Sequence, residues 1–337
     1  MAKRVVVIPG DDAAPEAMLP VVEILKSLNL DIQWTEFPSG EEGMKRYGSR
    51  SAFDQALREA IDQSDTTLFG STNGTTGGIN HLRWGKQTFA NVRPARWRPG
   101  FRSPLKNPDG IDFVIVRENL EDLYMGVEGD LQHLSSLPVT SWLTRKPLDT
   151  TPVGKFAIKV ITEAGTRRVV RFACELARKR KARGGKGKLT CTSKYNMLRE
   201  SDGLFRRIAE ETAKEYPDIR YEQYIVDDFA RRLVASPYDL DVVVMPNLYG
   251  DILSDAAAGT IGGLGLAPSG CYGENYAYFE SIHGTAPDIV GKHVINPTAT
   301  LLSATMMLDY LNFPDAVERI DLAVSQVYAD GRALTVD

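Results

Sequence analysis

Cysteine is scarce in this chain, and long apolar runs are missing. The three cysteines among 337 residues, Cys174, Cys191 and Cys271, are too few and too scattered for a disulfide framework or a zinc site. Such usage is typical of a reducing compartment, so we expect a cytoplasmic protein. The apolar run Val5–Ile8 is shorter than the about 7–15 residues of a secretory signal. No stretch approaches the ~18 apolar residues of a membrane helix, and we expect no membrane partner.

A large excess of one charge is also missing. Charged residues make up 25% of the chain and hydrophobic residues 43%, and the formal net charge is −4, which is the balance of a globular protein. A global field that would attract nucleic acid is therefore not expected. Seven basic residues gather between Arg178 and Lys188, but no aromatic residues for base stacking lie among them. We interpret them as the solvated end of a helix before a Gly-Gly turn, and expect no nucleic-acid partner.

Two familiar nucleotide-binding signatures are absent. The pattern G-x-G-x-x-G does not follow the first predicted strand, and G-x-x-x-x-G-K-[ST] occurs nowhere. We therefore expect neither a standard Rossmann fold nor a P-loop. If the protein binds a dinucleotide, a different loop must hold it.

Predicted strands and helices alternate along the chain. Short runs rich in β-branched residues are expected as strands, and segments with apolar residues at helical spacing as helices. The alternation predicts an α/β protein with a largely parallel sheet covered by helices. The predicted strands are Val5–Ile8, Ile32–Phe37, Thr66–Phe69, Ile111–Val116, Ala157–Val160, Leu189–Ser193, Arg220–Val226 and Asp241–Met245, and the predicted helices are Glu16–Leu28, Ala52–Gln63, Thr162–Lys181, Asp202–Glu215, Thr298–Leu311 and Ala316–Ala329.

An acidic pair stands in the segment NLYGDILSDAAAGTIGGLGLAPSG, residues 247–270. A helix is expected to begin near Gly250, which places Asp251 and Asp255 on one face of its first turn. Capping of the helix N-terminus explains one acidic residue well and the second less well. Paired carboxylates at this spacing also suit Mg²⁺ or Mn²⁺. Both interpretations stay open at this point.

Arginines and possible proton carriers lie beside the predicted strands. Arg83, Arg93 and Arg117 flank apolar segments, where guanidinium groups could grip the carboxylates of a small polyacid in bidentate fashion. Surface arginines are the ordinary alternative. Tyr124 and Lys194 each stand near a strand end, and either side chain could move a proton.

A loop of small residues occupies ESIHGTAPDIVGKHVINPTA, residues 280–299. Its glycines permit a close backbone approach to a ligand. A carboxylate such as that of Asp288 could accept the hydroxyl groups of a ribose.

In this order, these segments resemble the β-decarboxylating dehydrogenase family of isocitrate, homoisocitrate, 3-isopropylmalate, tartrate and D-malate dehydrogenases. The most specific stretches are LRWGKQTFANVRPAR (82–96), IDFVIVRENLEDLYMGVE (111–128), the segment 247–270 and HGTAPDIVGK (283–292). The resemblance implies an α/β protein with the isocitrate/isopropylmalate dehydrogenase-like fold, in which two domains surround a large mixed sheet.

The resemblance also implies how the chain is divided. A nucleotide-side domain would take residues 1–97 and 243–337. A central domain, 98–242, would carry the substrate and dimer contacts and an arm near 127–153. Such proteins form homodimers whose active sites are shared between the subunits.

Roles follow from the resemblance residue by residue. The interval of 24 residues before Asp251 favours Asp227 over its neighbour Asp228 as the metal ligand given by the other subunit. The implied catalytic residues are Tyr124 and, from the other subunit, Lys194; the substrate arginines are Arg83, Arg93 and Arg117; the metal ligands are Asp227, Asp251 and Asp255; and the dinucleotide contacts are Asn196, Glu280, His283, Gly284, Asp288, Ile289 and Asn296.

The implied activity is oxidative decarboxylation of a 3-substituted (2R)-malate with NAD and Mg²⁺ or Mn²⁺. NAD-dependent members carry an aspartate at the position of Asp288, where NADP-dependent members tend to have a lysine for the 2′-phosphate. A carboxylate repels that phosphate, so we expect NAD.

The substrate loop is polar in this chain. Asn80 and His81 stand where the group on C3 of the malate would be read, which favours an isocitrate- or homoisocitrate-like substrate. Tartrate, D-malate and 3-isopropylmalate are the enzyme alternatives. A regulatory subunit without catalysis is another, although such subunits tend to lose the tyrosine, lysine or aspartates that this chain keeps.

One motif departs from the family pattern. The first turn, usually GDGIGPE, is GDDAAPE at residues 10–16, so Asp12 and Ala14 replace two glycines. Because aspartate tolerates a positive φ better than alanine does, Ala14 is the less expected change.

Overall fold

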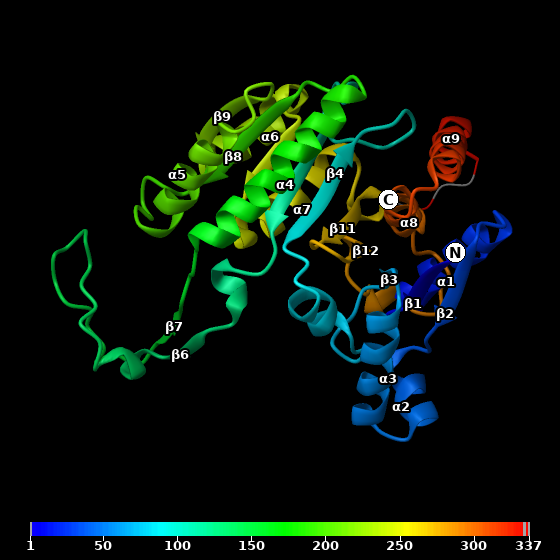
Figure 1. Ribbon diagram of the computed structural model, residues 1–337, viewed down its shortest axis with the longest axis horizontal. Helices are drawn as coiled ribbons and strands as arrows, with labels where there is room; N and C mark the ends of the chain where they lie inside the picture. The colour runs from blue at the N-terminus through cyan, green and yellow to red at the C-terminus, as the bar shows by residue number, and fades with distance from the viewer. Residues whose placement is uncertain (1, 333–334, 336–337) are drawn as a thin grey trace.

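A ten-stranded mixed sheet runs through the whole molecule (Figure 1). The computed structural model describes residues 2–332 and 335. The strand order across the sheet is β2-β1-β3-β12-β11-β4-β5-β10-β8-β9. The strands are β1 (Lys3–Ile8), β2 (Ile32–Glu36), β3 (Thr66–Phe69), β4 (Ala90–Arg96), β5 (Asp112–Glu118), β8 (Lys188–Ser193), β9 (Arg220–Ile225), β10 (Val242–Met245), β11 (Pro268–Tyr272) and β12 (Ala277–Ser281).

The sheet is parallel toward both edges and antiparallel in the middle. Strands β2, β1, β3 and β12 run parallel to one another, as do β5, β10, β8 and β9. Between these sets, β11 and β4 make antiparallel pairs with their neighbours. The predicted α/β class and the large mixed sheet are confirmed, and the antiparallel centre is what the alternation of elements did not predict.

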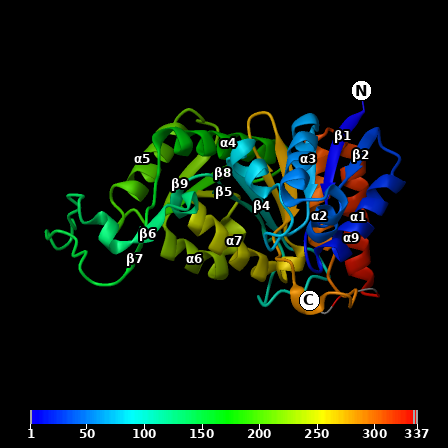
Figure 2. The same ribbon diagram turned by 90° about the horizontal axis from the view of Figure 1, so that it is seen from below.

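Helices cover both faces of the sheet. On the half that contains β5, β8 and β9, Figure 2 shows α4 and α5 on one side and α6 and α7 on the other. Because both faces are covered, strands such as β10 are buried along their whole length and consist of apolar residues. The helices are α1 (Ala14–Ser27), α2 (Gly40–Tyr47), α3 (Arg50–Gln63), α4 (Glu163–Ala182), α5 (Ser201–Ala213), α6 (Val226–Ala235), α7 (Asn247–Ile261), α8 (Thr298–Tyr310) and α9 (Pro314–Asp330).

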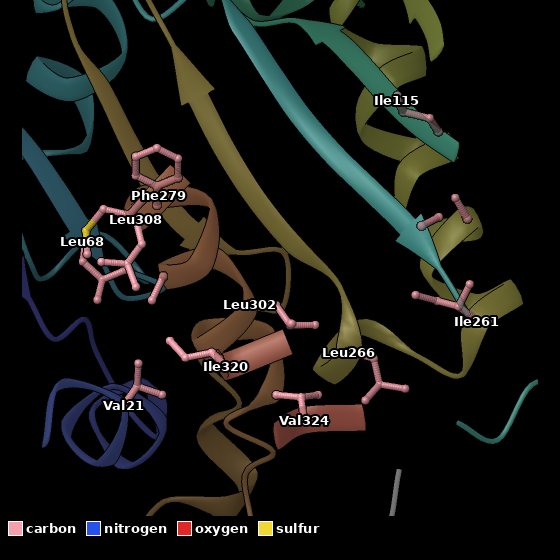
Figure 3. Close-up of a cluster of buried hydrophobic side chains, with 14 of the residues drawn as sticks. Val21, Leu68, Ile115, Ile261, Leu266, Phe279, Leu302, Leu308, Ile320 and Val324 are labelled. Carbon is pink, nitrogen blue, oxygen red and sulfur yellow. The ribbon is translucent and has the colours of Figure 1, made fainter. Parts of the chain in front are cut away.

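The largest apolar cluster joins the two ends of the chain to its middle. Figure 3 shows Leu68 of β3 and Phe279 of β12 near Leu308 of α8, with Ile115 of β5 and Ile261 of α7 farther along the same cluster. Burial of such side chains contributes roughly 1.5–3 kcal/mol each. This cluster fixes the central strands that carry the polar residues described below.

Helix α7 begins earlier than predicted. Its first residue is Asn247, directly after Pro246, rather than a residue near Gly250. Asp251 and Asp255 therefore lie beyond the first turn, where no backbone N–H is left for a side-chain cap. The capping interpretation of these two carboxylates does not apply.

Two smaller expectations also need correction. The predicted strand Ala157–Val160 is instead β7 (Lys155–Ala157), which pairs with β6 (Glu128–Asp130). In the first turn, Asp12 has a φ of +53°, as its side chain permits, whereas Ala14 is simply the first residue of α1. Ala14 is therefore not the unusual change.

The basic run at the end of α4 is paired within the chain. Arg178 binds Asp218, and both Lys179 and Arg183 bind Asp309. The other four cations also have partners within the chain: Arg180 binds Asp112 and Asp241, Lys181 binds the backbone of Asp218, Lys186 binds the backbone of Leu240, and Lys188 binds Glu222. This fits the interpretation as a helix end. Within the described part of the chain, no helix is long and apolar enough to cross a membrane.

One strand spans a boundary of the predicted domains. β10 (Val242–Met245) lies between β5 and β8, next to strands from the central part of the chain, and the predicted boundary at residue 243 falls within it. The division into domains stays a prediction.

Candidate active site

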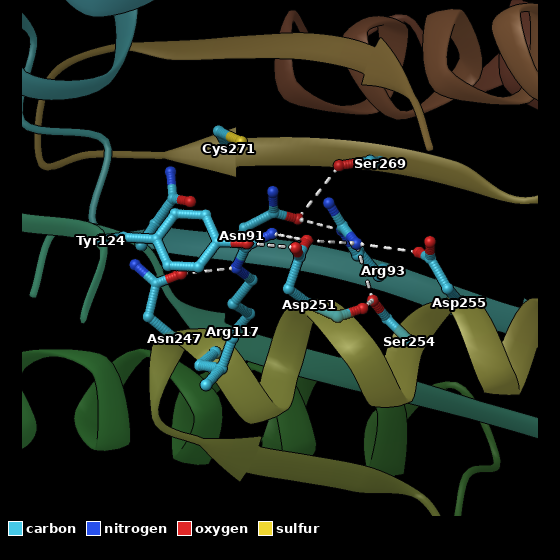
Figure 4. A network of polar contacts seen from close by, with 12 residues as sticks. Asn91, Arg93, Arg117, Tyr124, Asn247, Asp251, Ser254, Asp255, Ser269 and Cys271 are labelled. Atoms are coloured by element: carbon cyan, nitrogen blue, oxygen red, sulfur yellow. Dashed lines mark hydrogen bonds and ion pairs between the residues drawn. The ribbon is translucent and has the colours of Figure 1, made fainter. Parts of the chain in front are cut away.

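Two arginines, Arg93 and Arg117, lie side by side on the central strands and face Asp251 and Asp255 (Figure 4). Arg93 lies on β4 and Arg117 on the adjacent β5, and α7 packs across both strands. Arg93 Nη1 lies 3.3 Å from carboxylate oxygens of both Asp251 and Asp255, and Arg117 makes a close ion pair with Asp251. Arg83 joins them from the π-helix η1 (His81–Gly85), with its guanidinium over the Tyr124 ring.

Buried asparagines orient these guanidinium groups. Asn119 Oδ1 accepts a hydrogen bond of 2.6 Å from Arg83, and Asn247 Oδ1 one of 2.8 Å from Arg117 Nε. Asn91 Oδ1 accepts one of 3.2 Å from Arg93 Nε. Sequence reasoning missed all three. Their signal was an amide side chain at the end of, or inside, an otherwise apolar strand segment.

Several donors in this group have no acceptor. Among the residues that the structure describes, Arg83 Nε, Asn91 Nδ2 and Arg117 Nη2 are buried nitrogens without a hydrogen-bond partner. A buried unsatisfied donor costs about 1–3 kcal/mol, so three in one group call for an explanation. A ligand with several anionic oxygens would satisfy them.

Charge in the group is only partly balanced. Burial and the nearby guanidinium groups of Arg93 and Arg83 lower the pKa of Arg117 to about 10. Burial by itself would raise the pKa of the Asp251 carboxyl, but Arg117 and the hydrogen bond from Tyr124 outweigh it and hold that pKa below its usual range. The site therefore combines three cations with a carboxylate that stays ionised.

Tyr124 lies at the centre of this arrangement. It belongs to the short 3₁₀ helix η2 (Asp122–Met125), and its hydroxyl donates to Asp251. Its ring stacks against the Arg117 guanidinium, 4.7 Å from the ring centroid. Burial and the hydrogen bond to Asp251 raise the pKa of Tyr124, so the hydroxyl keeps its proton near neutral pH. A protonated phenol in this position can serve as an acid.

Lys194 and Asp227 form a second, separate cluster. Lys194 follows β8, Asp227 is in the first turn of α6, and Lys194 Nζ lies 2.5 Å from Asp227 Oδ1. Asn196 stands two residues after Lys194 and is exposed. Asp228 instead binds Arg231 and Arg232 of its own helix, so each of the two carboxylates is paired within the chain and the choice of Asp227 as metal ligand stays a prediction. No contact joins this cluster to the arginine group among the described residues.

The remaining dinucleotide candidates lie on the connection from β12 to α8. Glu16 of α1 holds this loop through the backbone N–H groups of Gly291, at 2.6 Å, and His293, at 2.9 Å. Asp288 is exposed in the short helix η6 (Pro287–Ile289). Glu280 lies near the end of β12, before the loop. The loop itself carries His283, Gly284, Ile289 and Asn296. Asn296 is buried, and its side chain donates a hydrogen bond to Tyr328.

The substrate-loop residues are only partly where the sequence suggested. His81 Nε2 lies 2.8 Å from Asp62 of α3 and makes no contact with the three arginines among the described residues. Its ring is already paired outside the arginine group, so we propose Asn80 and not His81 as the residue that contacts the C3 arm of the substrate. Asn80 is exposed. Ile79 and Leu82 pack into the apolar cluster beneath the loop.

A cavity elsewhere in the molecule contains none of these residues. It has a volume of about 620 Å³ and lies between α4 and α8, lined by Val92, Phe172 and Tyr272 among others. The polar donors and carboxylates that could perform chemistry are in the arginine group, so we place the site there.

The carboxylates can be tested for a metal site. Asp251 and Asp255 are hard oxygen donors one helical turn apart, with side chains 34% and 51% exposed. No group of three or more His, Cys, Asp or Glu residues that could hold a metal occurs in the part of the chain that the structure describes. The pair fits Mg²⁺ or Mn²⁺ if further ligands come from substrate, water or another subunit.

Comparison with known proteins identifies the family of this chain. Residues 4–337 match the model of the isocitrate/isopropylmalate dehydrogenase family. The chain is 40% identical to the 3-isopropylmalate/3-methylmalate dehydrogenase of Methanocaldococcus jannaschii, over 97% of this chain and 92% of that protein. It is 39% identical to a probable isocitrate dehydrogenase [NAD] subunit alpha, mitochondrial, of Caenorhabditis elegans, over 99% and 87%.

A solved structure resembles the whole fold. The isocitrate dehydrogenase of Methylococcus capsulatus superimposes with a TM-score of 0.82 at 33% identity, covering 99% of this chain and 93% of that one. The sequence comparison and the fold therefore confirm the resemblance first seen in four short segments. The chain belongs to the isocitrate/isopropylmalate dehydrogenase family, a family of metal-dependent decarboxylating dehydrogenases that act on hydroxy acids.

Proposed function

We propose that this protein catalyses the NAD- and divalent-metal-dependent oxidative decarboxylation of a 3-substituted (2R)-malate. The observation that carries the proposal is the group of buried donors without acceptors on Arg83, Asn91 and Arg117. Two carboxylates of a malate present four acceptor oxygens at a spacing that such donors can grip in pairs. Binding would also relieve the repulsion among the guanidinium groups, which together with burial lowers the pKa of Arg117.

Asp251 and Asp255 would hold Mg²⁺ or Mn²⁺, together with Asp227 of a second subunit. When bound, such an ion would polarise the hydroxyl group of the substrate and the carbonyl group formed from it. NAD, when bound, would supply the acceptor for the hydride from C2.

The residues of this chain supply the proton steps. Lys194 would take the proton of the C2 hydroxyl as the hydride leaves. The β-keto acid then loses CO₂, and Tyr124 delivers a proton to C3. This assignment agrees with the raised pKa of Tyr124, which keeps a proton ready for transfer.

The second cluster supports a shared site in a homodimer. Lys194 and Asp227 contact each other but nothing in the arginine group, so a complete site needs a second copy of the chain. The segment 127–153 supplies a surface for that copy. Figure 1 shows it projecting away from the sheet on the β6–β7 ribbon, and it exposes Leu137, Val139 and Leu143. Exposed apolar side chains of this number are typical of a subunit interface.

Cofactor choice gives the first prediction. Asp288→Lys replaces a carboxylate that would repel the 2′-phosphate of NADP with an ammonium group that would attract it. We expect the ratio of kcat/KM for NAD to that for NADP to fall at least about tenfold, which corresponds to roughly 1.4 kcal/mol. Steady-state kinetics with both cofactors measures this ratio.

The matched control is Lys292→Met, four residues along the same loop. Lys292 donates to the backbone of Asp288, so the variant disturbs the loop without changing the charge of Asp288. An unchanged ratio in Asp288→Lys, or an equal change in both variants, would contradict the assignment of Asp288 to the ribose.

Substrate preference gives the second prediction. The apolar side chains Ile79 and Leu82 serve the core, so the loop offers the exposed Asn80 instead of an apolar wall. We propose an isocitrate- or homoisocitrate-like substrate, and expect a polar C3 arm to exceed 3-isopropylmalate at least about tenfold in kcat/KM. Asn80→Leu should narrow that difference.

His81→Leu is the control for the same loop, because the structure binds His81 to Asp62. It should leave the preference unchanged. The relatives include both an isopropylmalate and an isocitrate dehydrogenase, so both substrates are compared in the same kinetic assay. A better rate with 3-isopropylmalate would refute the polar-arm proposal and leave the family assignment intact.

A further inference from the structure

A buried ion-pair network links the turn of Tyr124 to the turn of Lys194. Lys159 Nζ lies 3.0 Å from Asp122 Oδ1 and 2.9 Å from Asp202 Oδ1. Both aspartate side chains are fully buried, and that of Lys159 is 13% exposed. Among the residues that the structure describes, no ion pair or hydrogen bond joins Lys159, Asp122 or Asp202 to the three arginines.

One end of the network holds the Tyr124 turn. Asp122 is the first residue of η2 and has a φ of +68°, a left-handed conformation that aspartate tolerates better than most residues other than glycine. Its carboxylate accepts the backbone N–H of Leu123 at 2.9 Å and that of Leu248 at 3.0 Å. Asp122, which stands two residues before Tyr124, thereby fixes η2 against the first turn of α7.

The other end holds the Lys194 turn. Asp202, in the first turn of α5, accepts the backbone N–H of Lys194 at 2.6 Å. The second oxygen of the same carboxylate faces Lys159. The ammonium group of Lys159 also lies over the Tyr249 ring, 4.5 Å from its centroid. Without Lys159, the buried carboxylates of Asp122 and Asp202 would have no neighbouring cation. Burying two unpaired negative charges is strongly unfavourable for folding.

We infer that Lys159 is a positioning residue that couples the two active sites of the dimer. The inference rests on the proposed function, in which Tyr124 serves the site of its own subunit and Lys194 the site of the partner. Since both turns are held by one ammonium group, a disturbance at Lys159 reaches one proton carrier in each site. A residue that supported only its own site would not have this effect.

The test uses Lys159→Met in homodimers and in heterodimers with wild-type subunits, purified through two different tags. In the homodimer we expect kcat to fall roughly 10- to 100-fold with KM changed less than about threefold, because Lys159 moves proton carriers and does not touch the substrate arginines. Lys159→Arg, which keeps the charge, should recover part of kcat.

The heterodimer is the decisive measurement. Each of its sites takes one turn from the variant subunit, so we expect activity far below half of the wild-type value. A heterodimer of wild-type and Tyr124→Phe subunits, with one intact site, should keep about half. If the wild-type/Lys159→Met heterodimer also keeps half, the coupling is refuted while the proposed function stands. A failure of the shared-site proposal shows separately, because exchange between Asp227→Asn and Asp251→Asn subunits would then restore no activity.

Two further variants separate positioning from folding. Lys188→Met removes a comparably buried lysine, 2.8 Å from Glu222, at the opposite end of β8 from Lys194. It should lower stability but leave kcat within about twofold. If Lys159→Met does not fold, the neutral combination Asp122→Asn, Lys159→Met and Asp202→Asn avoids an unpaired buried charge. The coupling then predicts the same heterodimer result, and half activity refutes it.

Discussion

Asp227→Asn and Asp251→Asn should each abolish the activity of a homodimer, and a mixture of the two should regain about a quarter of the wild-type activity. Each substitution removes one carboxylate from every proposed metal site. In a heterodimer, however, one site combines the intact Asp251 of the Asp227→Asn subunit with the intact Asp227 of the Asp251→Asn subunit. The other site carries both substitutions. Random exchange makes about half of the dimers heterodimers, and each of these has one intact site out of two.

The measurement is the activity of the two variants before and after subunit exchange. Native mass spectrometry gives the fraction of heterodimers. Asp228→Asn is the matched control, because Asp228 is bound to Arg231 and Arg232 and should leave most activity in place. If heterodimers form and no activity returns, Asp227 does not act across the subunit boundary.

Tyr124→Phe should reduce kcat by roughly 10²–10⁴ while the protein stays folded and binds its substrate. The substitution removes one hydroxyl group and keeps the ring that stacks on Arg117. The hydroxyl is the only group that can protonate C3 in the proposed mechanism, so hydride transfer and decarboxylation should continue more readily than protonation. Steady-state kinetics gives kcat, and equilibrium dialysis with the substrate gives binding.

The loss in Tyr124→Phe should also be uneven between steps. Reduction of an added β-keto acid by NADH bypasses protonation at C3 and should be affected much less than the overall reaction. An equal loss in both reactions would mean that Tyr124 positions the substrate and does not donate a proton. Tyr249→Phe, on the neighbouring helix α7, controls for loss of a phenol near the site.

Much of the fold could be predicted because local signals and burial agree. Helix α4 was placed within one residue at each end, since its apolar face is regular and Thr162 caps its first turn. Strand β3 is a run of four buried residues with a clear end at Gly70. The four family segments likewise placed the arginines, Tyr124 and the aspartates on elements that the structure brings together.

The start of α7 shows why other features could not be predicted. Gly250 looks like a helix breaker, but a Cβ there would lie 2.6 Å from Cβ of Arg117 on β5. The glycine allows the helix to cross the strand closely, which is a tertiary requirement with no local signal. The capping interpretation of Asp251 arose from this misplaced helix start.

Hydrogen-bond partners that come from distant parts of the chain could not be predicted either. His81 was predicted to face the substrate, whereas Asp62 of α3 binds it. The asparagines that orient the arginines depend on the register of β4 against β5, in which Asn91 pairs with Arg117. Period and composition describe which face of a strand is buried, but not which buried amide meets which guanidinium.

In the proposed function, the arginine group and the two aspartates bind a malate derivative for oxidative decarboxylation. The most direct test follows the reduction of NAD and the release of CO₂ together, with Mg²⁺ or Mn²⁺, across isocitrate, homoisocitrate, 3-isopropylmalate, tartrate and D-malate. We predict that at least one substrate gives one CO₂ for each NADH, and that chelation of the metal stops both. NADH formed without CO₂, or no reaction with any of these substrates and either NAD or NADP, would contradict the account.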